Sequence, residues 1–471
     1  MHNHQNTSLY FLGAGGIGMS ALIRYFLSKG SQVAGYDRTE SELTRQLNTE
    51  GAQIHYEENP DAIPVEFRDK AKTMVVLTPA IPKENTELQW FEKEGFKIIK
   101  RAQVLGEITR VTQGLCIAGT HGKTTTSSML AHLLKQSHVD CNAFLGGILK
   151  NYDSNLLLSS TSNLTVIEAD EYDRSFHWLN PSMAVVTSVS PDHLDIYGTA
   201  EAYRESFEKF ASLVRSGGVL LLESNVKMKL ELQTGVKVYR YAAALNSDSS
   251  GIDFYAENIK TGDGEIHFDF VAPDRKIVDI NLGVPVRINI QNAVAAIAIA
   301  SLCGVRDDEI KTSMASFQGV RRRFDFHIKT TDLALIDDYA HHPEELSASI
   351  YSVRELYPNR RLTVIFQPHL YTRTRDFYRE FAVALSQADE VILLPIYPAR
   401  EEPIEGVSSQ MILDLVTSAG RHLLTKSELL DYVSSVNFEV LLMAGAGDIE
   451  LLVEPVKTII NTQEKCRKKR K

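Results

Sequence analysis

The chain has 471 residues, more than one hydrophobic core usually serves, so two to four domains are expected and three is the central expectation. Hydrophobic residues make up 44% of the chain and charged residues 23%, which is typical of a globular protein and argues against a disordered or fibrous one. A net charge of −10 argues against general nucleic-acid binding. The polar start at residues 1–8 and the lack of an 18-residue apolar run predict neither a signal peptide nor a membrane span, so a cytoplasmic protein is expected.

The first predicted unit is a strand at residues 8–12, a glycine-rich turn at 13–18 and an apolar helix that continues through Phe26. A second strand at residues 32–36 ends in Asp37. The turn has the glycine spacing of a dinucleotide-binding loop, and Asp37 follows at about the usual distance of 20 residues. The physics requires only a diphosphate at a helix N-terminus, so NAD, FAD and a UDP-sugar all satisfy it.

Two more strands are predicted in this part of the chain, at residues 73–78 and 97–100. Strands that alternate with helices indicate a parallel sheet, whose ligand loops lie at the carboxyl ends of the strands. The turn at residues 78–85, which ends in Asn85, is a secondary candidate for ligand contact, and a plain structural turn explains it equally well.

The second glycine-rich turn lies between an apolar strand at residues 115–118 and a predicted helix at 127–135. Gly119 and Gly122 allow the backbone to approach a phosphate chain, Lys123 can reach the terminal phosphates, and Thr124 can bind Mg²⁺. The match to the general phosphate-loop pattern is incomplete, since Ile117 stands where that pattern has its first glycine. The interpretation is an ATP phosphate site.

Polar residues follow the next two strands of this unit. A strand at residues 164–167 leads into Glu168, and a strand at 183–189 leads into Asp192 and His193. Because parallel strands end at one edge of a sheet, Glu168 and His193 are expected to meet Thr124 around a cation. Oxygen ligands and water suit Mg²⁺, with substrate phosphates completing its coordination.

A helix is predicted at residues 293–302, with Asn289 and Asn292 near its start. Their amides suit either a helix cap or the edge of an adenine base. Three arginines at residues 321–323 follow, where the chain enters new sequence, and are available to phosphate oxygens.

The last unit repeats the arrangement of strands that end in polar residues. A strand at residues 333–336 leads into a segment with His341 and His342, and a strand at 362–366 leads into one with Arg373 and Arg375. The two arginines suit a carboxylate or a phosphate, and a solvated pair needs no ligand. Strands at residues 390–394 and 440–444 complete a predicted doubly wound sheet.

Taken together, these motifs resemble those of the Mur ligase family of peptidoglycan synthesis, from Gly13 to Asp448. The last two motifs are typical of the branch that adds alanine. In chain order the matching motifs are GAGGIGMS at 13–20, GTHGKTTT at 119–126, EADE at 168–171, DHLD at 192–195, RRF at 322–324, DYAHHP at 338–343 and QPHLYTRTRD at 367–376.

The resemblance implies three α/β domains. They are an N-terminal Rossmann-like domain for the UDP-sugar (1–107), a central ATP-binding domain of the P-loop type (108–319) and a C-terminal Rossmann-like, doubly wound domain that closes over the active site (320–471). The resemblance also implies the site residues. Those for the UDP-sugar are Gly13, Gly15, Gly16, Gly18 and Asp37; for ATP, Gly119, Thr120, His121, Gly122, Lys123, Thr124, Thr125, Asn289, Asn292 and Arg323; for Mg²⁺, Thr124, Glu168 and His193; and for catalysis, Lys123, His342, Arg373 and Arg375.

The implied activity is the ATP-dependent joining of L-alanine to the muramoyl carboxylate of UDP-N-acetylmuramate, by a monomer or homodimer. Three alternatives remain: a ligase that attaches a whole tripeptide, an NAD-dependent oxidoreductase, and a UDP-sugar sensor without turnover. The chain departs from the family at Ile288, where a histidine is usual near the adenine. Lys209 lies near the position of a carbamylated lysine in sister ligases, and no carbamate is predicted there.

Overall fold

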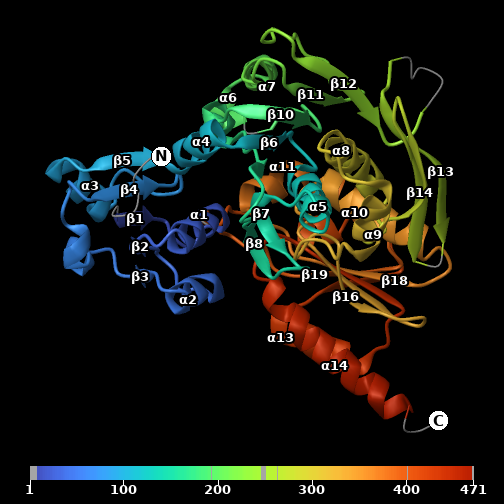
Figure 1. Cartoon of the computed structure of the whole chain (residues 1–471). Coiled ribbons are helices and arrows are strands. Elements are labelled where there is room, and N and C mark those ends of the chain that lie inside the picture. Colours follow the sequence, from blue (N-terminus) through green and yellow to red (C-terminus); the bar gives the residue numbers. More distant parts are fainter. Residues whose placement is uncertain (1–7, 193, 246–250, 263, 400, 469–471) are drawn as a thin grey trace. The chain divides into compact units, whose positions relative to one another are not determined.

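The computed structural model describes residues 8–192, 194–245, 251–262, 264–399 and 401–468. Within these residues, mostly parallel strands form three sheets and alternate with helices (Figure 1). The chain divides into two compact units: the first contains most of the chain up to residue 318, and the second contains residues 319–471 together with 259–267 and 282–289. In the described part of the chain, no helix is both long and apolar enough to cross a membrane.

The first sheet is fully parallel, with the order β3-β2-β1-β4-β5. This is the strand order of a Rossmann-type nucleotide-binding domain. All five residues of the central strand β1 are buried, as expected for a parallel sheet with both faces covered. The elements are β1 (Ser8–Leu12), α1 (Ile17–Ser28), β2 (Val33–Tyr36), α2 (Glu42–Thr49), β3 (Gln53–His55), β4 (Thr73–Leu77), α3 (Thr86–Glu94), β5 (Lys97–Lys100) and α4 (Arg101–Val111).

The second sheet has the order β15-β14-β13-β12-β11-β10-β6-β9-β7-β8, so β6 lies between β10 and β9. This order places the ends of β6, β9 and β10 at one edge, where ligands bind in such sheets. The elements are β6 (Gln113–Ala118), α5 (Lys123–Lys135), β7 (Asn142–Leu149), β8 (Ser154–Leu157), β9 (Leu164–Glu168), β10 (Pro181–Val186), α6 (Leu194–Tyr197), α7 (Ala200–Ser212), β11 (Val219–Glu223), β12 (Lys237–Ala242), β13 (Phe254–Gly262), β14 (Glu265–Val271), β15 (Lys276–Asn281), α8 (Ile288–Leu302) and α9 (Asp307–Ser316).

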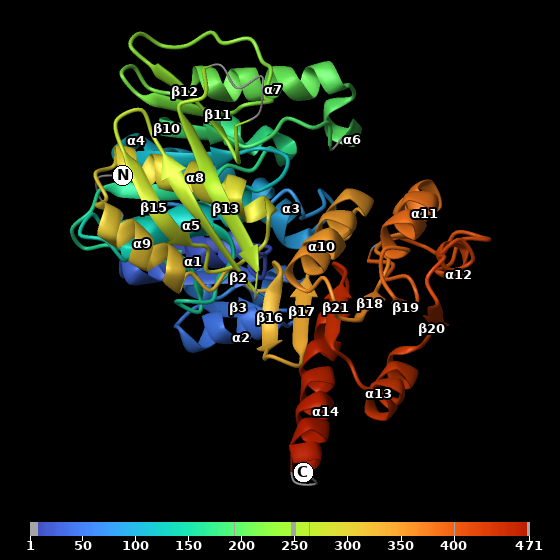
Figure 2. The same cartoon turned by 90° about the vertical axis from the view of Figure 1, so that its right-hand side faces the viewer.

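The third sheet has the order β16-β17-β21-β18-β19-β20, with β16 antiparallel and the others parallel. Figure 2 shows β16, β17 and β21 side by side, as this order requires. The elements are β16 (Asp325–Lys329), β17 (Ala334–Asp338), α10 (Pro343–Leu356), β18 (Leu362–Phe366), α11 (Tyr371–Leu385), β19 (Glu390–Leu393), α12 (Gln410–Leu413), β20 (Gly420–Leu423), α13 (Lys426–Ser435), β21 (Val440–Ala444) and α14 (Glu450–Lys468).

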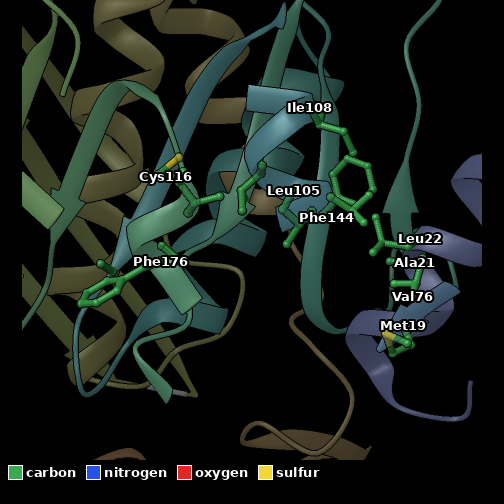
Figure 3. Packing of buried hydrophobic residues seen from close by; sticks show 14 of the residues in the cluster. Met19, Ala21, Leu22, Val76, Leu105, Ile108, Cys116, Phe144 and Phe176 are labelled. Atoms are coloured by element: carbon green, nitrogen blue, oxygen red, sulfur yellow. The ribbon is translucent and has the colours of Figure 1, made fainter. Parts of the chain in front are cut away.

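One hydrophobic cluster joins the first sheet's helix α1 to the second sheet. Figure 3 shows Leu22 of α1 near Phe144 of β7, and the ring of Tyr25 lies 5.4 Å from that of Phe144. The buried amide of Asn155 in β8 adds polar contacts, since its Nδ2 atom donates to the carbonyl of Ile17 and to Ser20 Oγ (3.0 Å). The helix that follows the first glycine loop is therefore fixed to the strands of the second sheet.

The predicted strands are confirmed, with three corrected boundaries. β10 ends at Val186 rather than residue 189, and α8 begins at Ile288 rather than 293, so Asn289 and Asn292 lie inside its first turns. β17 continues through Asp337 and Asp338, which were expected in the following loop. Both aspartates are buried. Asp338 accepts from the backbone N–H of Phe324 and from Ser349 Oγ, whereas Oδ1 of Asp337 makes no hydrogen bond within the described residues. The strand continues past residue 336 because Asp337 and Asp338 pair with Met443 and Ala444 of β21.

Candidate active site

The second glycine loop connects β6 to α5 with two glycines in the left-handed region. Gly119 has φ +141° and Gly122 has φ +84°, conformations that L side chains rarely adopt. A Cβ atom on Gly119 would lie 2.0 Å from Thr187 Oγ1, and one on Gly122 would lie 2.6 Å from Asn292 Oδ1. The loop is therefore tightly enclosed, and its backbone leads directly into the N-terminus of α5, where N–H groups favour anions.

Lys123 opens α5, and its ammonium group lies inside the loop. Its Nζ donates to the carbonyl of Gly119 (2.6 Å) and forms an ion pair with Glu171 Oε2 (2.8 Å). Burial raises the pKa of the Glu171 carboxyl, whose side chain is 2% exposed, and the charge of Lys123 opposes that rise. Glu171 was not predicted as a site residue, although it belongs to the 168–171 motif. It holds the Lys123 ammonium group within the loop.

Thr124 and Glu168 meet as predicted. Thr124 Oγ1 donates to Glu168 Oε1 (2.9 Å), and the backbone N–H of Gly146 donates to Glu168 Oε2 (3.0 Å). A hydroxyl and a carboxylate are the oxygen donors that Mg²⁺ prefers, and Mg²⁺ commonly uses one or two carboxylates together with substrate phosphates. The pair therefore fits Mg²⁺, although the described residues contain no group of three or more acidic, histidine or cysteine ligands. His193, the third predicted ligand, lies outside the described residues.

The segment after β10 forms the other wall of the loop. The backbone N–H of Thr120 donates to the carbonyl of Ser188, and that of His121 donates to Ser188 Oγ. Thr120 Oγ1 also contacts the hydroxyl of Tyr203 (2.9 Å). His121 is exposed and Thr125 is partly buried. These contacts fix the conformation of the loop, so the predicted residues 119–125 form one continuous turn that leads into α5.

The two predicted adenine-site asparagines are buried in the first turns of α8. Asn292 Oδ1 accepts from Thr126 Oγ1 (3.2 Å) and lies against Gly122, so it packs directly on the phosphate loop. Asn289 Nδ2 donates to the carbonyl of Val284 (3.3 Å). The structure thus brings Asn292 to the loop, and it gives Asn289 a bond within its own helix entry.

The first glycine loop is held by Asp37. Asp37 Oδ2 accepts from the backbone N–H of Gly15 (2.7 Å), and Oδ1 accepts from that of Thr39 (3.1 Å). Gly13 has φ +87°, and Gly16 is the N-cap of α1 without a side-chain cap bond. The acidic residue at the end of β2 therefore fixes the turn, and the N-terminus of α1 carries no acidic side chain in its first turn.

Gly18 is covered by a side chain that the sequence did not indicate. A Cβ atom on Gly18 would lie 2.1 Å from Nη1 of Arg101, and Arg101 Nη2 donates to Asp170 Oδ2 (2.9 Å). Arg101 was not predicted as a site residue. It joins the first loop to the acidic segment after β9, and no sequence signal marks a contact between residues this far apart.

The second unit contains the remaining predicted residues. The His342 ring lies 5.0 Å from that of Phe377 and lines a groove of about 430 Å³ between α10 and α11. Arg373 lies beside His369, whose pKa is lowered to about 4 by burial and by the neighbouring charges. Arg375 forms an exposed ion pair with Asp376 (2.7 Å). Arg323 lies over the ring of Tyr339.

Parallel α/β sheets, a glycine loop with Lys123 at a helix N-terminus and an adjacent hydroxyl–carboxylate pair define a nucleotide-phosphate-binding enzyme. Family models match most of the chain: Mur ligase family, catalytic domain, at residues 8–112; Mur ligase middle domain at 117–300; and Mur ligase, glutamate ligase domain, at 322–452. The chain belongs to the Mur ligase family.

Individual relatives agree with this assignment over nearly the full length. The UDP-N-acetylmuramate–L-alanine ligase of Parabacteroides distasonis is 63% identical over 457 residues, covering 97% of this chain and 98% of the relative. The crystal structure of UDP-N-acetylmuramate-alanine ligase from Thermotoga maritima has a TM-score of 0.79 at 26% identity and covers 98% of this chain and 99% of that one. A murein peptide ligase from Psychrobacter arcticus shares the fold, with a TM-score of 0.66 at 20% identity, over 96% of this chain and 98% of that one.

Proposed function

We propose that this chain is an ATP-dependent ligase that joins L-alanine to the muramoyl carboxylate of UDP-N-acetylmuramate and releases ADP and phosphate. The observation that carries the proposal is the phosphate loop, in which Lys123 pairs with Glu171 and Thr124 meets Glu168. Relatives that are 41–63% identical over nearly the whole chain bear the name UDP-N-acetylmuramate–L-alanine ligase.

In the proposed reaction the muramoyl carboxylate attacks the γ-phosphate of ATP, which gives an acyl phosphate and ADP. The amine of L-alanine then attacks the acyl carbon, and phosphate leaves. Phosphoryl transfer depends mainly on positioning and charge neutralisation. Lys123 neutralises the transferred phosphoryl charge, and the N–H groups at the start of α5 orient the phosphate chain. Bound Mg²⁺ supplies further charge neutralisation, and Thr124, Glu168 and His193 are the residues that we assign to hold it.

The second unit supplies the groups proposed for the carboxylate and the amine. Arg373 and Arg375 are assigned to the reacting carboxylate, because a guanidinium matches a carboxylate in two parallel hydrogen bonds. His342 is assigned to accept or guide the proton that the alanine amine loses. When a substrate carboxylate replaces Asp376 as the partner of Arg375, the charge of Arg375 stays paired.

The domain limits and the remaining ligand residues are part of the same proposal. The domains span residues 1–107, 108–319 and 320–471, and the protein acts in the cytoplasm, where ATP is available. Asn289, Asn292 and Arg323 are assigned to ATP. The UDP-sugar is assigned to the loop formed by Gly13, Gly15, Gly16, Gly18 and Asp37.

The test is ADP release by the purified protein with ATP, Mg²⁺ and UDP-N-acetylmuramate, with L-alanine, glycine, L-serine or the L-alanyl tripeptide added in turn. We expect release that depends on L-alanine and a product heavier by one alanine residue. Release with the tripeptide alone would instead identify a tripeptide ligase. A protein that binds the UDP-sugar without turnover of any acceptor would be a sensor.

A further inference from the structure

Arg101 occupies an unusual position at the start of α1. Its guanidinium approaches Gly18 with the Nη1 end, because a Cβ atom on that glycine would be 2.1 Å from Nη1 and 3.0 Å from Cζ. Arg101 itself is the first residue of α4, directly after β5, and its side chain is 20% exposed. A side chain at position 18 would displace the Nη1 end of Arg101 from the first turn of α1.

Asp170 holds this guanidinium from the other side. Arg101 Nη2 donates to Asp170 Oδ2 (2.9 Å), while Asp170 Oδ1 accepts from the backbone N–H of Tyr172 (3.0 Å). The carbonyl of Asp170 also accepts from the N–H of Phe176 (2.9 Å). Because the carboxylate is bonded on both oxygens, it fixes the direction in which Nη2 points. Nη1 is thereby directed along Gly18.

Arg101 has one carboxylate partner among the described residues, and its Nη1 end lies where a further anion is favoured. Asp170 pairs with Nη2 (2.9 Å), while Nη1 lies against Gly18 in the first turn of α1. The N-terminus of a helix carries partial positive charge, which favours an anion there. The first turn of α1 contains no acidic residue, and its N-cap Gly16 provides no side-chain acceptor. The nearby carboxylate of Asp37 already accepts two backbone N–H groups, those of Gly15 and Thr39. Nη1 of Arg101 and the N–H groups at the start of α1 are therefore available to the same anion.

We propose that Arg101 binds the diphosphate of the UDP-sugar at the first turn of α1, and that Asp170 is the positioning residue that directs Arg101 there. The inference rests on the proposed function, which assigns the glycine loop to the UDP-sugar, and adds to it the cation that the loop lacks. A guanidinium offers two parallel N–H donors to phosphate oxygens. The third glycine of the loop then leaves space for the arginine as well as for the phosphate.

The first experiment is calorimetric binding of UDP and of UDP-N-acetylmuramate to the full-length protein. Arg101→Gln is expected to weaken both ligands by about 10- to 100-fold, the effect of losing a hydrogen-bonded charge. The matched control is Lys100→Gln, which removes the neighbouring exposed ion pair with Asp173 (2.6 Å) and is expected to stay within about twofold, because exposed ion pairs contribute little. Arg101→Lys, which keeps the charge without the planar group, is expected to recover part of the affinity.

The second experiment separates positioning from a structural role. Asp170→Asn is expected to raise the KM for the UDP-sugar while kcat and the KM for ATP stay near those of the unaltered protein. If the two residues act as one unit, the double variant is expected to bind the UDP-sugar no more weakly than Arg101→Gln alone. A purely structural pair would instead lower the melting temperature and change both KM values together.

Two outcomes overturn the inference in distinguishable ways. If the unaltered protein binds the UDP-sugar and Arg101→Gln binds it equally well, Arg101 has no role in the diphosphate site and the proposed function stands. If the unaltered protein binds neither UDP nor the UDP-sugar, the proposed function fails and the inference fails with it. Melting curves identify a variant that has unfolded, and Arg101→Lys then provides the folded comparison.

Discussion

The two glycine loops of the first unit have the same plan and obtain their positive charge in different ways. Both follow a buried strand, β1 or β6, and both lead into a helix N-terminus. The second loop carries its own cation, Lys123, which the loop carbonyl of Gly119 and the carboxylate of Glu171 hold in place. The first loop contains no lysine or arginine, and its cation, Arg101, comes from the end of β5.

This difference indicates which substitutions affect the shape and the charge of each loop. The second loop has its shape and its charge in one short segment, since Gly119 and Gly122 set the turn and Lys123 provides the cation. The first loop divides these functions, with Asp37 fixing the turn and Arg101 providing the charge. Both cations are paired with carboxylates from the same segment, since Asp170 and Glu171 are neighbours after β9.

The largest expected effect is that of Lys123→Ala. It removes the cation of the second loop, so turnover is expected to fall by about 1,000-fold or more, as for other charge-stabilising groups in phosphoryl transfer. Binding of UDP-N-acetylmuramate to the first loop is expected to survive. ADP release and calorimetry measure the two quantities, with Lys135→Ala at the other end of α5 as the control. Unchanged turnover would remove the phosphate-loop assignment.

Two buried groups, Glu87 in α3 and His132 in α5, are expected to change the free energy of unfolding in opposite directions as the pH rises. Burial raises the pKa of Glu87 in α3 to about 7, although its hydrogen bond from Tyr10 of β1 opposes the rise. The folded state then favours the protonated carboxyl, so its contribution to stability is full below pH 4.5 and is lost as the pH rises towards 7, by up to about 3 kcal/mol. Glu87→Gln is expected to remove this pH dependence of stability. Glu94 is exposed, so Glu94→Gln is expected to leave the pH dependence unchanged.

The helix of the second loop shows the reverse trend. Burial lowers the pKa of His132 in α5 to about 4, and its ring contacts Tyr152 and Ser316. The folded state favours the neutral ring, so its contribution is full above pH 6.5 and is lost as the pH falls towards 4, by about 3 kcal/mol. The free energy of unfolding by denaturant, compared at pH 5 and pH 7, measures the contributions of Glu87 and His132. Trp90 fluorescence in a Trp178→Phe background reports the unfolding of the first sheet. If substitutions of Glu87 and of His132 changed the pH dependence of the free energy of unfolding in the same direction, the opposite pKa shifts assigned to these residues would be contradicted.

A smaller effect is expected for Glu168→Gln. The amide keeps an oxygen acceptor for Thr124 or Gly146 and loses the charge that a cation requires. The Mg²⁺ concentration for half-maximal ADP release is expected to rise about 10- to 100-fold, as for other changes at metal sites. Asp173→Asn in the same acidic region is the control, and an unchanged Mg²⁺ dependence would show that Glu168 is not a metal ligand.

The smallest expected effect compares one glycine from each loop by melting temperature. Gly122→Ala places a Cβ atom at φ +84° and 2.6 Å from Asn292 Oδ1, so it is expected to destabilise the protein by about 1–2 kcal/mol. Gly16→Ala places its Cβ atom no nearer than 3.6 Å to any atom at ordinary backbone angles, and a change within about 0.5 kcal/mol is expected. Equal losses would show that the loops are similarly enclosed.

Local sequence determined the apolar strands next to the motifs, the glycine turns and the identity of Lys123, Thr124 and Glu168, whereas strands such as β7, β13 and β14 were not predicted. These features depend on hydrophobic periodicity and on glycines at fixed spacing, which act over a few residues. The parallel arrangement also followed, because strands that alternate with helices place their carboxyl ends at one edge. Thus Thr124 and Glu168 were predicted to meet, and they do.

Tertiary structure alone decided which partner each charge has. Arg101 meets Gly18 and Asp170 because the carboxyl ends of β5 and β9 lie close together in the fold. The hydrophobic pattern of the sequence does not indicate the distance between these two strand ends. Likewise, Asp337 and Asp338 continue a strand because they pair with Met443 and Ala444 of β21, a strand that is distant in the sequence. The residues that carry chemistry are therefore predicted from short motifs, while the residues that position them depend on long-range packing.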